Sequence, residues 1–269
     1  MKAGRVYFIG AGPGAPDLLT LRGKALIESA DLVIYADSLV DERVCAFARP
    51  GAEILGSSSL TLDEITERMI EAVRAGKLVA RLQSGDPAIY GALHEQLARL
   101  DAADIPWEIV PGVTSAFAAA AALGVELTVP EMAQSVIMTR ISGRASPVPA
   151  GEDLASLAAH GTSLVLFLSI AHISRVIRDL RRGGYSLDTP VAVVYRVSWP
   201  DEQLIRGTLR TIRAQVREAQ LTRQALVLVG PVLAAQADAR RSRLYADAYT
   251  HLFRKGRATR RIPVDSGER

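Results

Sequence analysis

Short apolar runs alternate with segments of helical periodicity along most of this chain, and that order restricts the possible fold more than any other feature. Strand-like and helical segments follow one another in the first half over residues 5–11, 18–29, 31–36, 62–75, 78–82, 91–100 and 107–110. Alternation of this kind is typical of parallel β-strands joined by crossover helices. The sequence therefore predicts an α/β fold.

The same alternation restarts after an alanine-rich helical segment at residues 115–123. Further segments are predicted over residues 135–140, 153–159, 163–169, 173–182, 191–197, 203–208, 211–219 and 225–229. A chain of 269 residues exceeds the usual length of one domain. We therefore expect an N-terminal α/β domain at residues 1–122, a C-terminal α/β domain at 123–236, and a basic tail at 237–269.

Cysteine content and apolar run length indicate where such a protein resides. Cys45 is the only cysteine, so neither an intrachain disulfide nor a cysteine-rich metal cluster can form, as is usual in a reducing cytosol. No charged segment followed by a long apolar one opens the chain, and no apolar run approaches the ~18 residues of a membrane span. A cytoplasmic protein without a membrane partner is expected.

The formal net charge of +3 is concentrated near the C-terminus. Residues 238–269 hold nine Lys or Arg against four Asp or Glu, which leaves the rest of the chain close to neutral. Proteins that bind nucleic acid normally present a basic face to the phosphates. The charge distribution therefore argues against a nucleic-acid partner.

A glycine-rich loop at residues 10–15 follows the first predicted strand and has some features of a dinucleotide-binding loop. However, Pro13 and Pro16 lack the backbone N–H groups that would bind phosphate. Asp37 lies too far along the chain to contact a ribose in that arrangement. A tight turn that serves another ligand is the better interpretation.

Five motifs, in order, resemble those of the tetrapyrrole methylase family, the corrin and porphyrin methyltransferases. They are Gly10-Ala-Gly-Pro-Gly-Ala-Pro-Asp-Leu-Leu-Thr-Leu-Arg-Gly23, Ser84-Gly-Asp-Pro-Ala-Ile-Tyr-Gly91, Pro111-Gly-Val-Thr-Ser115, Arg206-Gly-Thr-Leu209 and Ala225-Leu-Val-Leu-Val-Gly-Pro231. The resemblance covers about residues 4 to 235. It implies two α/β domains, each a mixed five-stranded sheet with flanking helices, that hold the cofactor in the cleft between them, and it implies a homodimer.

Two further segments resemble one branch of that family. Residues 35–40 and 56–65 are similar to enzymes that methylate C11 of precorrin-4 or of its cobalt form, rather than to the uroporphyrinogen branch. The resemblance therefore implies a methyltransferase of cobalamin biosynthesis that uses S-adenosylmethionine, releases S-adenosylhomocysteine and acts on an acidic tetrapyrrole. Methyl transfer from a sulfonium needs chiefly the alignment of donor and acceptor.

The resemblance also assigns candidate site residues. Those expected to line the cofactor pocket, or to adjoin it, are Pro13, Ser84, Gly85, Asp86, Ile89, Thr114, Ser115, Leu168, Tyr195, Arg196, Val197 and Ala225. Asp37 occupies the position of an acid proposed to assist proton transfer in related enzymes, although a turn role at a strand end competes with it. Arg140, Arg144 and Arg196 are candidates to pair with substrate carboxylates, because the guanidinium fork suits acetate and propionate groups. The four histidines are isolated in the sequence, so no protein-bound metal is expected.

Several alternatives remain at this point. Another precorrin methylase, a diphthine synthase or a ribosomal RNA ribose methyltransferase would have the same fold, and the near-neutral body argues against the RNA enzyme. A tetrapyrrole carrier without catalytic activity is an alternative from a different class. Binding of S-adenosylhomocysteine would argue against the carrier.

Overall fold

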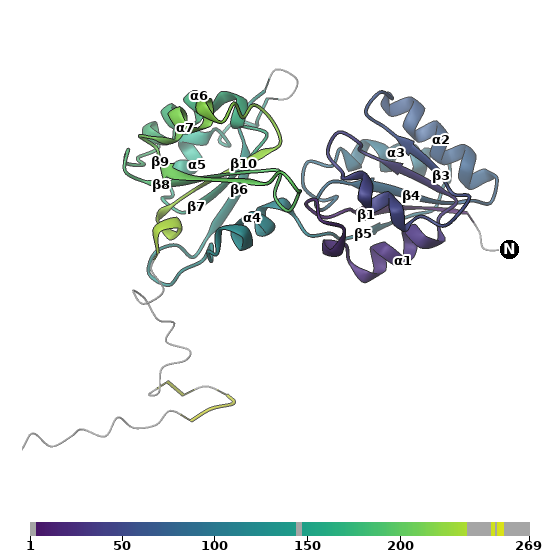
Figure 1. The fold of residues 1–269 in the computed structure, drawn as a ribbon, viewed down its shortest axis with the longest axis horizontal. Helices are drawn as coiled ribbons and strands as arrows, with labels where there is room; N and C mark the ends of the chain where they lie inside the picture. The colour runs from purple at the N-terminus through teal and green to yellow at the C-terminus, as the bar shows by residue number, and fades with distance from the viewer. Residues whose placement is uncertain (1–3, 144–146, 236–248, 251, 256–269) are drawn as a thin grey trace, which may run out of the picture.

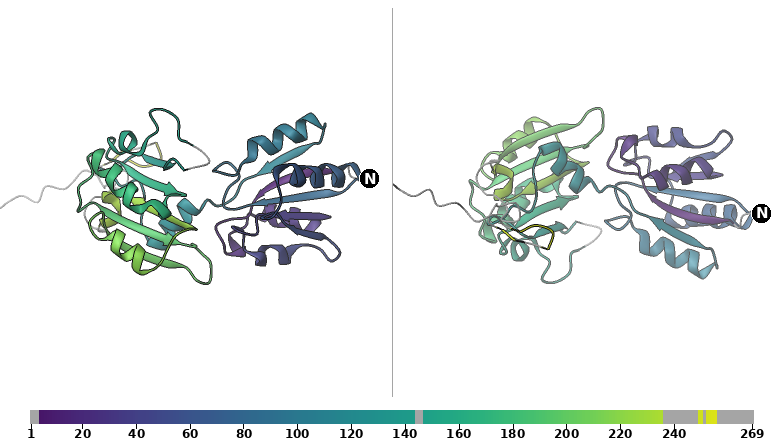
Figure 2. Two further views of the ribbon diagram at one scale, coloured as in Figure 1. Left: turned by 90° about the horizontal axis from the view of Figure 1, so that it is seen from above. Right: turned by 90° about the horizontal axis from the view of Figure 1, so that it is seen from below.

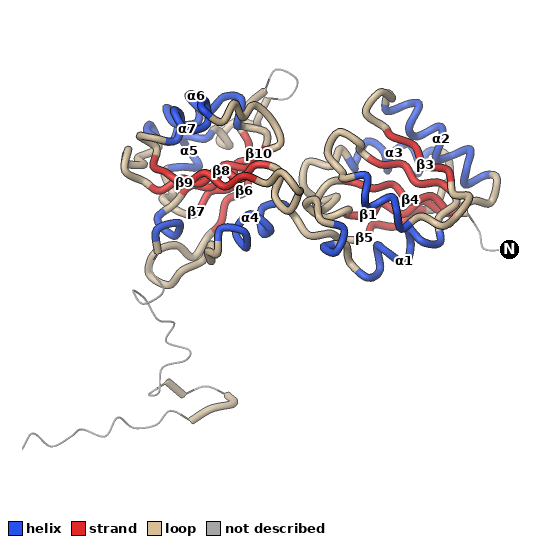
Figure 3. Tube along the Cα trace, viewed as in Figure 1, coloured by secondary structure: helices blue, strands red, loops and turns tan. Residues whose placement is uncertain are grey.

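The computed structural model describes residues 4–143, 147–235, 249–250 and 252–255. These residues form two α/β lobes that lie side by side along the long axis of the molecule (Figures 1 and 2). In each lobe a sheet lies between layers of helices (Figure 3). The two-domain α/β architecture expected from the sequence is therefore confirmed. The predicted basic tail at residues 237–269 lies mostly outside the described residues.

The N-terminal lobe is built on a five-stranded sheet in the order β3-β2-β4-β1-β5. Its elements are β1 (Arg5–Gly10), η1 (Pro16–Leu18), α1 (Leu21–Ser29), β2 (Leu32–Tyr35), η2 (Glu42–Phe47), β3 (Glu53–Gly56), α2 (Leu62–Arg74), β4 (Leu78–Gln83), α3 (Leu93–Ala102) and β5 (Trp107–Val110). Every pair of neighbouring strands is parallel. The expectation of a mixed sheet was wrong for this lobe, because each strand-to-strand connection contains a helix that returns the chain to the same edge.

The C-terminal lobe has a mixed sheet in the order β6-β7-β10-β8-β9. Its elements are α4 (Ser115–Leu123), β6 (Val136–Arg140), α5 (Leu154–Ala158), β7 (Ser163–Phe167), η3 (Ile170–His172), α6 (Ile173–Arg182), β8 (Pro190–Tyr195), β9 (Gln203–Thr208), α7 (Ile212–Glu218), β10 (Ala225–Val229) and η4 (Pro231–Ala234). Strand β10 lies antiparallel between β7 and β8, and β8 lies antiparallel between β9 and β10.

The strand alternation predicted parallel neighbours, and this was wrong for most of the second sheet. Helix α6 does connect two parallel strands, β7 and β8, but β10 occupies the gap between them in the reverse direction. Helix α7 likewise connects β9 to β10 across β8. A helical crossover fixes the relative direction of the two strands that it joins, and it leaves open which strand lies between them.

Each sheet has an apolar cluster on both faces. In the first lobe, α2 and α3 cover one face and α1 with η2 covers the other, so Phe8 and Ile9 of β1 point to opposite cores. In the second lobe, α5, α6 and α7 cover one face and α4 covers the other. Strands buried on both faces are expected to be continuous apolar runs, as β10 is.

Helix α4 packs on the second sheet and marks where the two lobes divide. Its buried alanines contact Val165 of β7, Val194 of β8 and Leu228 of β10. The boundary between the packed units therefore lies between Val110 and Ser115, earlier than the predicted division at residues 122 and 123. An alanine-rich helix is apolar all round, so its sequence gives no indication of the sheet that it covers.

Candidate functional site

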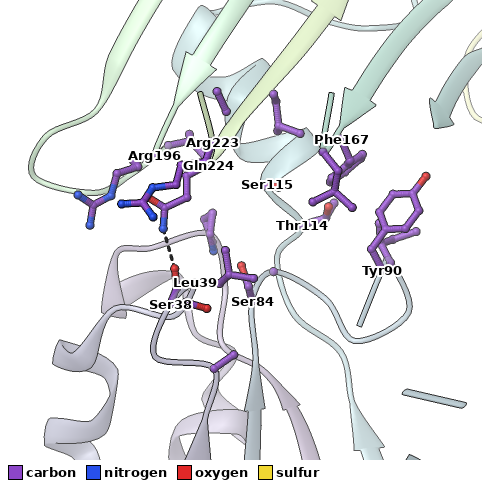
Figure 4. A pocket seen from close by; sticks show the side chains of 18 of the residues that line it. Ser38, Leu39, Ser84, Tyr90, Thr114, Ser115, Phe167, Arg196, Arg223 and Gln224 are labelled. Carbon is purple, nitrogen blue, oxygen red and sulfur yellow. Dashed lines mark hydrogen bonds between the residues drawn. The ribbon is translucent and has the colours of Figure 1, made fainter. Parts of the chain in front are cut away.

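A cleft of about 640 Å³ lies where the two lobes meet (Figure 4). Both lobes line it: the first through the carboxyl ends of β2 and β4, the second through β7, β8 and β10 and the loops beside them. Ligands of α/β proteins bind beyond the carboxyl ends of parallel strands, and small-molecule pockets are commonly ~300–1,000 Å³. The cleft is therefore the candidate ligand site.

Three glycines bring the motif loops together at the edge of the first sheet. Gly10 ends strand β1, and Gly85 and Gly112 follow its two neighbours in the sheet, β4 and β5. A Cβ on Gly112 would lie 2.2 Å from the carbonyl oxygen of Gly85, and a Cβ on Gly10 would lie 2.6 Å from Gly112 Cα. The three loops can meet this closely only because Gly10 and Gly112 carry no side chain.

Asp86 connects two of these loops through its carboxylate. Oδ1 accepts a hydrogen bond from the backbone N–H of Ala88 at 2.8 Å, and Oδ2 accepts one from the N–H of Gly112 at 2.8 Å. Both oxygens are thus engaged by the protein itself. The side chain therefore orders the loop, and it does not cap α3, since that helix begins only at Leu93.

We expect Asp86→Asn to destabilise the protein and to weaken ligand binding. The amide would place an N–H donor where one of the two backbone N–H groups now finds an acceptor, and a hydrogen bond to a charged group contributes about 1.5–3 kcal/mol. Urea denaturation would report the loss of unfolding free energy. Asp188→Asn is the control, because Asp188 is exposed and pairs only with Arg210 among the described residues. Equal stability of the two variants would contradict the structural role.

Thr114 and Ser115 lie at the start of α4, directly against the cleft. Thr114 is the N-cap residue, and its hydroxyl accepts a hydrogen bond from the N–H of Ala116 at 3.4 Å. The first amides of a helix favour an anionic or carbonyl ligand. The capping role of Thr114 and a ligand contact by Ser115 are therefore compatible.

One wall of the cleft is apolar and partly open to solvent. The rings of Tyr90 and Phe167, from different lobes, pack with their centroids 5.3 Å apart. Leu168 is 65% exposed and adopts a positive φ of 51°. A bulky residue held in the left-handed region costs free energy and is found more often at functional sites than elsewhere. This wall suits a large, flat or apolar ligand surface.

Hydrogen bonds from the second lobe close the other side of the cleft. Trp199 Nε1–H donates to the carbonyl of Pro13 at 3.0 Å, and Ser198 Oγ accepts from the N–H of Ala15 at 2.9 Å. Gln224 Nε2–H donates to the carbonyl of Ser38 at 2.6 Å, drawn as the dashed line in Figure 4. These contacts fix the separation of the lobes, and with it the width of the cleft.

Basic side chains outnumber acidic ones in the cleft. Arg81, Arg196 and Arg223 line it, against Asp86 as the one acid among the described lining residues. The Arg196 guanidinium lies 4.0 Å from the centroid of the Trp199 ring, and its Nε is buried without a hydrogen-bond partner among the described residues. A cleft with this charge balance suits an acidic ligand.

Of the twelve residues predicted to bind or adjoin the cofactor, all except Tyr195 line this one cleft. Tyr195 lies at the end of β8 and packs against the core under α5, α6 and α7. Side chains alternate along a strand, and Val194 already points to the cleft side, so Tyr195 must face the opposite way. Its expected place beside the pocket was therefore wrong. The cofactor contacts of the others stay predictions.

Asp37 is exposed at the end of β2 and is held by a neighbouring loop. Its carboxylate accepts hydrogen bonds from the hydroxyl and the backbone N–H of Ser58, at 2.6 and 2.7 Å. The Ser58 hydroxyl lowers the pKa of Asp37 below its ordinary value. A carboxylate with a lowered pKa is a weaker base, so this geometry favours the turn role over proton transfer.

Of the substrate candidates, Arg196 lines the cleft and Arg140 lies beside it. The Arg140 guanidinium lies 5.9 Å from the ring centroid of Tyr90, which lines the cleft, whereas Arg140 itself does not line it. Arg144 lies outside the described residues. Among the described residues, no group of three or more His, Cys, Asp or Glu side chains is arranged to hold a metal ion.

Sequence reasoning missed several residues of the cleft. They are Leu39, Arg81, Gln83, Tyr90, Phe167, Arg223 and Gln224. Arg81 and Gln83 directly precede the Ser84-Gly85 loop, and Arg223 and Gln224 precede Ala225. The signal that could have identified these four residues is a polar side chain directly before a motif, next to an otherwise apolar strand.

Comparison with known proteins connects this cleft to a family. The family model for Tetrapyrrole (Corrin/Porphyrin) Methylases matches residues 5–213. A cobalt-precorrin-4 C(11)-methyltransferase of Methanocaldococcus jannaschii is 47% identical over 251 residues, which cover 93% of this chain and 96% of that protein. A precorrin-4 C(11)-methyltransferase of Mycobacterium tuberculosis is 46% identical over 253 residues, covering 94% and 98%.

Two solved structures have the same fold. The X-ray structure of a cobalt precorrin-4 methyltransferase, described as a cobalamin biosynthetic enzyme, superposes with a TM-score of 0.83 at 46% identity and covers 85% of this chain and 95% of its own. A uroporphyrin-III C-methyltransferase from Thermus thermophilus, complexed with S-adenosylhomocysteine, gives a TM-score of 0.72 at 33% identity, covering 86% and 99%. Among the residues that the structure describes here, no helix has the length and apolar character needed to cross a membrane.

Proposed function

The chain belongs to the tetrapyrrole (corrin/porphyrin) methylase family, and we propose that it transfers a methyl group from S-adenosylmethionine to C11 of precorrin-4, which gives precorrin-5 in cobalamin biosynthesis. The observation that carries this proposal is the cleft between the lobes, into which the motif loops converge. Its excess of arginine suits the carboxylates of a tetrapyrrole. Relatives named for C11 methylation match over nearly the whole chain.

The residues of the cleft fit the methyl donor. Gly85 has a φ of +66° and leaves room for a ligand to approach the backbone, while Thr114 and Ser115 present hydroxyls beside it. The apolar side chains of Ile89 and Leu168 would pack on the less polar parts of the donor. When bound, S-adenosylmethionine supplies a methyl group that the positive charge on its sulfur has already activated.

Positioning is the main work left to the protein. Because the donor is activated, the chain has to hold the accepting carbon in line with the methyl group and to exclude water. Arg196 and Arg223 from the second lobe are proposed to pair with substrate carboxylates, and Arg140 to assist them from beside Tyr90. Assistance by Asp37 in proton transfer stays a prediction, and the lowered pKa of its carboxyl group argues against it.

A homodimer and a cytoplasmic location also stay predictions that follow from the family resemblance and from the composition of the chain. Neither alters the chemistry proposed for the cleft.

The test is methyl transfer with a labelled donor. Purified protein would be incubated with methyl-labelled S-adenosylmethionine and either precorrin-4, cobalt-precorrin-4 or uroporphyrinogen III. We expect mass spectrometry to detect one labelled methyl group on a precorrin-4 substrate, with fragmentation placing it at C11, and none on uroporphyrinogen III. Absence of transfer to both forms of precorrin-4 would refute the proposal, and transfer to uroporphyrinogen III alone would move the chain to that branch.

A further inference from the structure

The part of the cleft that the first lobe lines extends beyond the predicted cofactor residues. Ala36, Ser38 and Leu39 follow β2. Arg81 and Gln83 are among the last three residues of β4. The proposal above assigns no individual contact to Arg81 or Gln83. Their side chains share one face of the strand because they are two residues apart.

Arg81 is a buried cation whose direct partners are all neutral. It is 6% exposed, its Nη1–H donates to Ser57 Oγ at 3.0 Å, and its Nε–H donates to Gln96 Oε1 at 3.2 Å. Among the described residues, no carboxylate lies within ion-pair distance of it. Burial lowers the pKa of Arg81 to about 10, so the side chain still carries its charge at neutral pH.

The hydrogen bonds of Arg81 hold the guanidinium but leave part of it unused. Ser57 Oγ in turn donates to the carbonyl of Tyr35 at 3.1 Å, and Gln96 Nε2 donates to the carbonyl of Ala92 at 3.0 Å, so both partners are themselves fixed. The terminal nitrogen Nη2 makes no hydrogen bond to a described residue. A buried charge without a counter-charge is costly, which favours a site that an anion completes.

Asp37 is the acid that acts on Arg81 from a distance. Its charge raises the pKa of Arg81, against the larger effect of burial. However, both oxygens of its carboxylate accept hydrogen bonds from Ser58, and the side chain is exposed. Asp37 therefore does not occupy the position that an anion in the cleft would take on Arg81.

Gln83 presents an unused acceptor beside Arg81. Its Nε2–H donates to the carbonyl of Gly91 at 2.9 Å. This hydrogen bond distinguishes the nitrogen of the side-chain amide from its oxygen. Gln83 is only 4% exposed, and its Oε1 is buried without a hydrogen-bond partner among the described residues. A buried carbonyl oxygen of this kind is expected to receive a donor from a ligand or from water.

We propose that Arg81 and Gln83 form a specificity site for the tetrapyrrole on the first lobe, in which Arg81 binds one carboxylate and Gln83 Oε1 accepts a hydrogen bond from a pyrrole N–H. This inference rests on the proposed function and adds to it the residues that orient the substrate. A pyrrole ring with an acidic side chain carries both groups on one rigid unit. A cation and an acceptor two residues apart on one face of a strand can engage them together.

The site should distinguish the tetrapyrrole from the methyl donor, and this gives the test. Binding of uroporphyrin III, a stable acidic tetrapyrrole, would be followed by its fluorescence in the presence of S-adenosylhomocysteine, and the affinity for S-adenosylhomocysteine would be measured by calorimetry. Because a hydrogen bond to a charged group is worth about 1.5–3 kcal/mol, Arg81→Met should weaken porphyrin binding about 10- to 100-fold. The affinity for S-adenosylhomocysteine should stay at the wild-type value.

Two further variants and a control complete the experiment. Arg81→Lys keeps the charge but not the planar fork, so it should recover part of the porphyrin affinity. Gln83→Met loses one neutral hydrogen bond and should weaken porphyrin binding by a smaller factor, about 2- to 10-fold. Arg210→Met removes an exposed arginine that pairs with Asp188 away from the cleft, and it should bind both ligands as the wild type does.

The outcomes separate this inference from the proposed function, because porphyrin binding is measured without methyl transfer. Selective loss of porphyrin affinity in Arg81→Met supports the inference. Unchanged porphyrin affinity in that variant, an equal loss of affinity for both ligands, or failure of the wild type to bind uroporphyrin III would overturn it. Failure of the wild type to methylate precorrin-4 would instead refute the proposed function and leave the binding result as it stands.

Discussion

Gly112→Ala is expected to disable the cleft although it adds a single methyl group. The new Cβ would lie 2.2 Å from the carbonyl oxygen of Gly85 and 2.7 Å from the Cα of Gly10, and neither backbone atom can turn aside as a side chain can. Overpacking of this kind costs about 1–3 kcal/mol. A shift of ~1 Å in a site can lower the rate about 100-fold. We expect a loss of that order in methyl transfer, with weaker binding of S-adenosylhomocysteine.

Gly143→Ala is the matched control for this variant. A Cβ at Gly143 would meet no other atom within 4 Å, and its φ is not positive, so the same added methyl group should leave affinity and activity unchanged. Urea denaturation of both variants would separate loss of stability from loss of the site. A Gly112→Ala protein with wild-type activity would mean that the loops can part without consequence for the cleft.

Features that depend on local sequence could be predicted well. The glycine loops after β1, β4 and β5 were identified as ligand loops, since short strands that end in glycine or Pro-Gly have a local signature. Most strands and helices were found within one or two residues. The strand β3 was missed because Glu53–Gly56 is a short edge strand with half of its residues exposed, and it has no continuous apolar run.

Features that depend on how the two lobes meet could not be predicted from single segments. Trp199 and Pro13 are 186 positions apart, and so are Gln224 and Ser38, so no sequence window contains both partners of either contact. The side of the sheet that α4 covers and the reversed direction of β10 could not be predicted for the same reason. Each is decided by packing between elements, whereas the periodicity of a segment reports only its own conformation.

The burial of Arg81 illustrates the same limit at the level of one residue. The sequence presents Arg81 between apolar neighbours in β4, where it would be taken as an outward-facing charge at the end of a strand. The structure instead surrounds it with Ser57 and Gln96, which come from the loop after β3 and from α3. These neutral partners are brought to Arg81 only when three separate elements are assembled. Because the buried charge has no counter-charge, an anionic ligand is the expected partner.

Gly85→Arg should abolish binding of S-adenosylhomocysteine while the protein stays folded. A Cβ at Gly85 would meet its nearest neighbour, the backbone nitrogen of Ser115, at an ordinary 3.6 Å, so the backbone need not move. Because Gly85 lines the cleft, the long side chain would extend into the space that the ligand requires. The positive φ of 66° adds strain of about 1–2 kcal/mol, which lowers the melting temperature by only a few degrees.

The strain and the filling of the cleft can be separated with Gly76→Arg. Gly76 also has a positive φ, of 78°, and nothing lies within 4 Å of its Cβ position, so this variant carries similar backbone strain far from the site. Calorimetry should detect no S-adenosylhomocysteine binding to Gly85→Arg and wild-type binding to Gly76→Arg, with similar melting temperatures for the two. Undiminished affinity in Gly85→Arg would place the ligand elsewhere, because an arginine at position 85 would occupy space that the donor requires in the cleft.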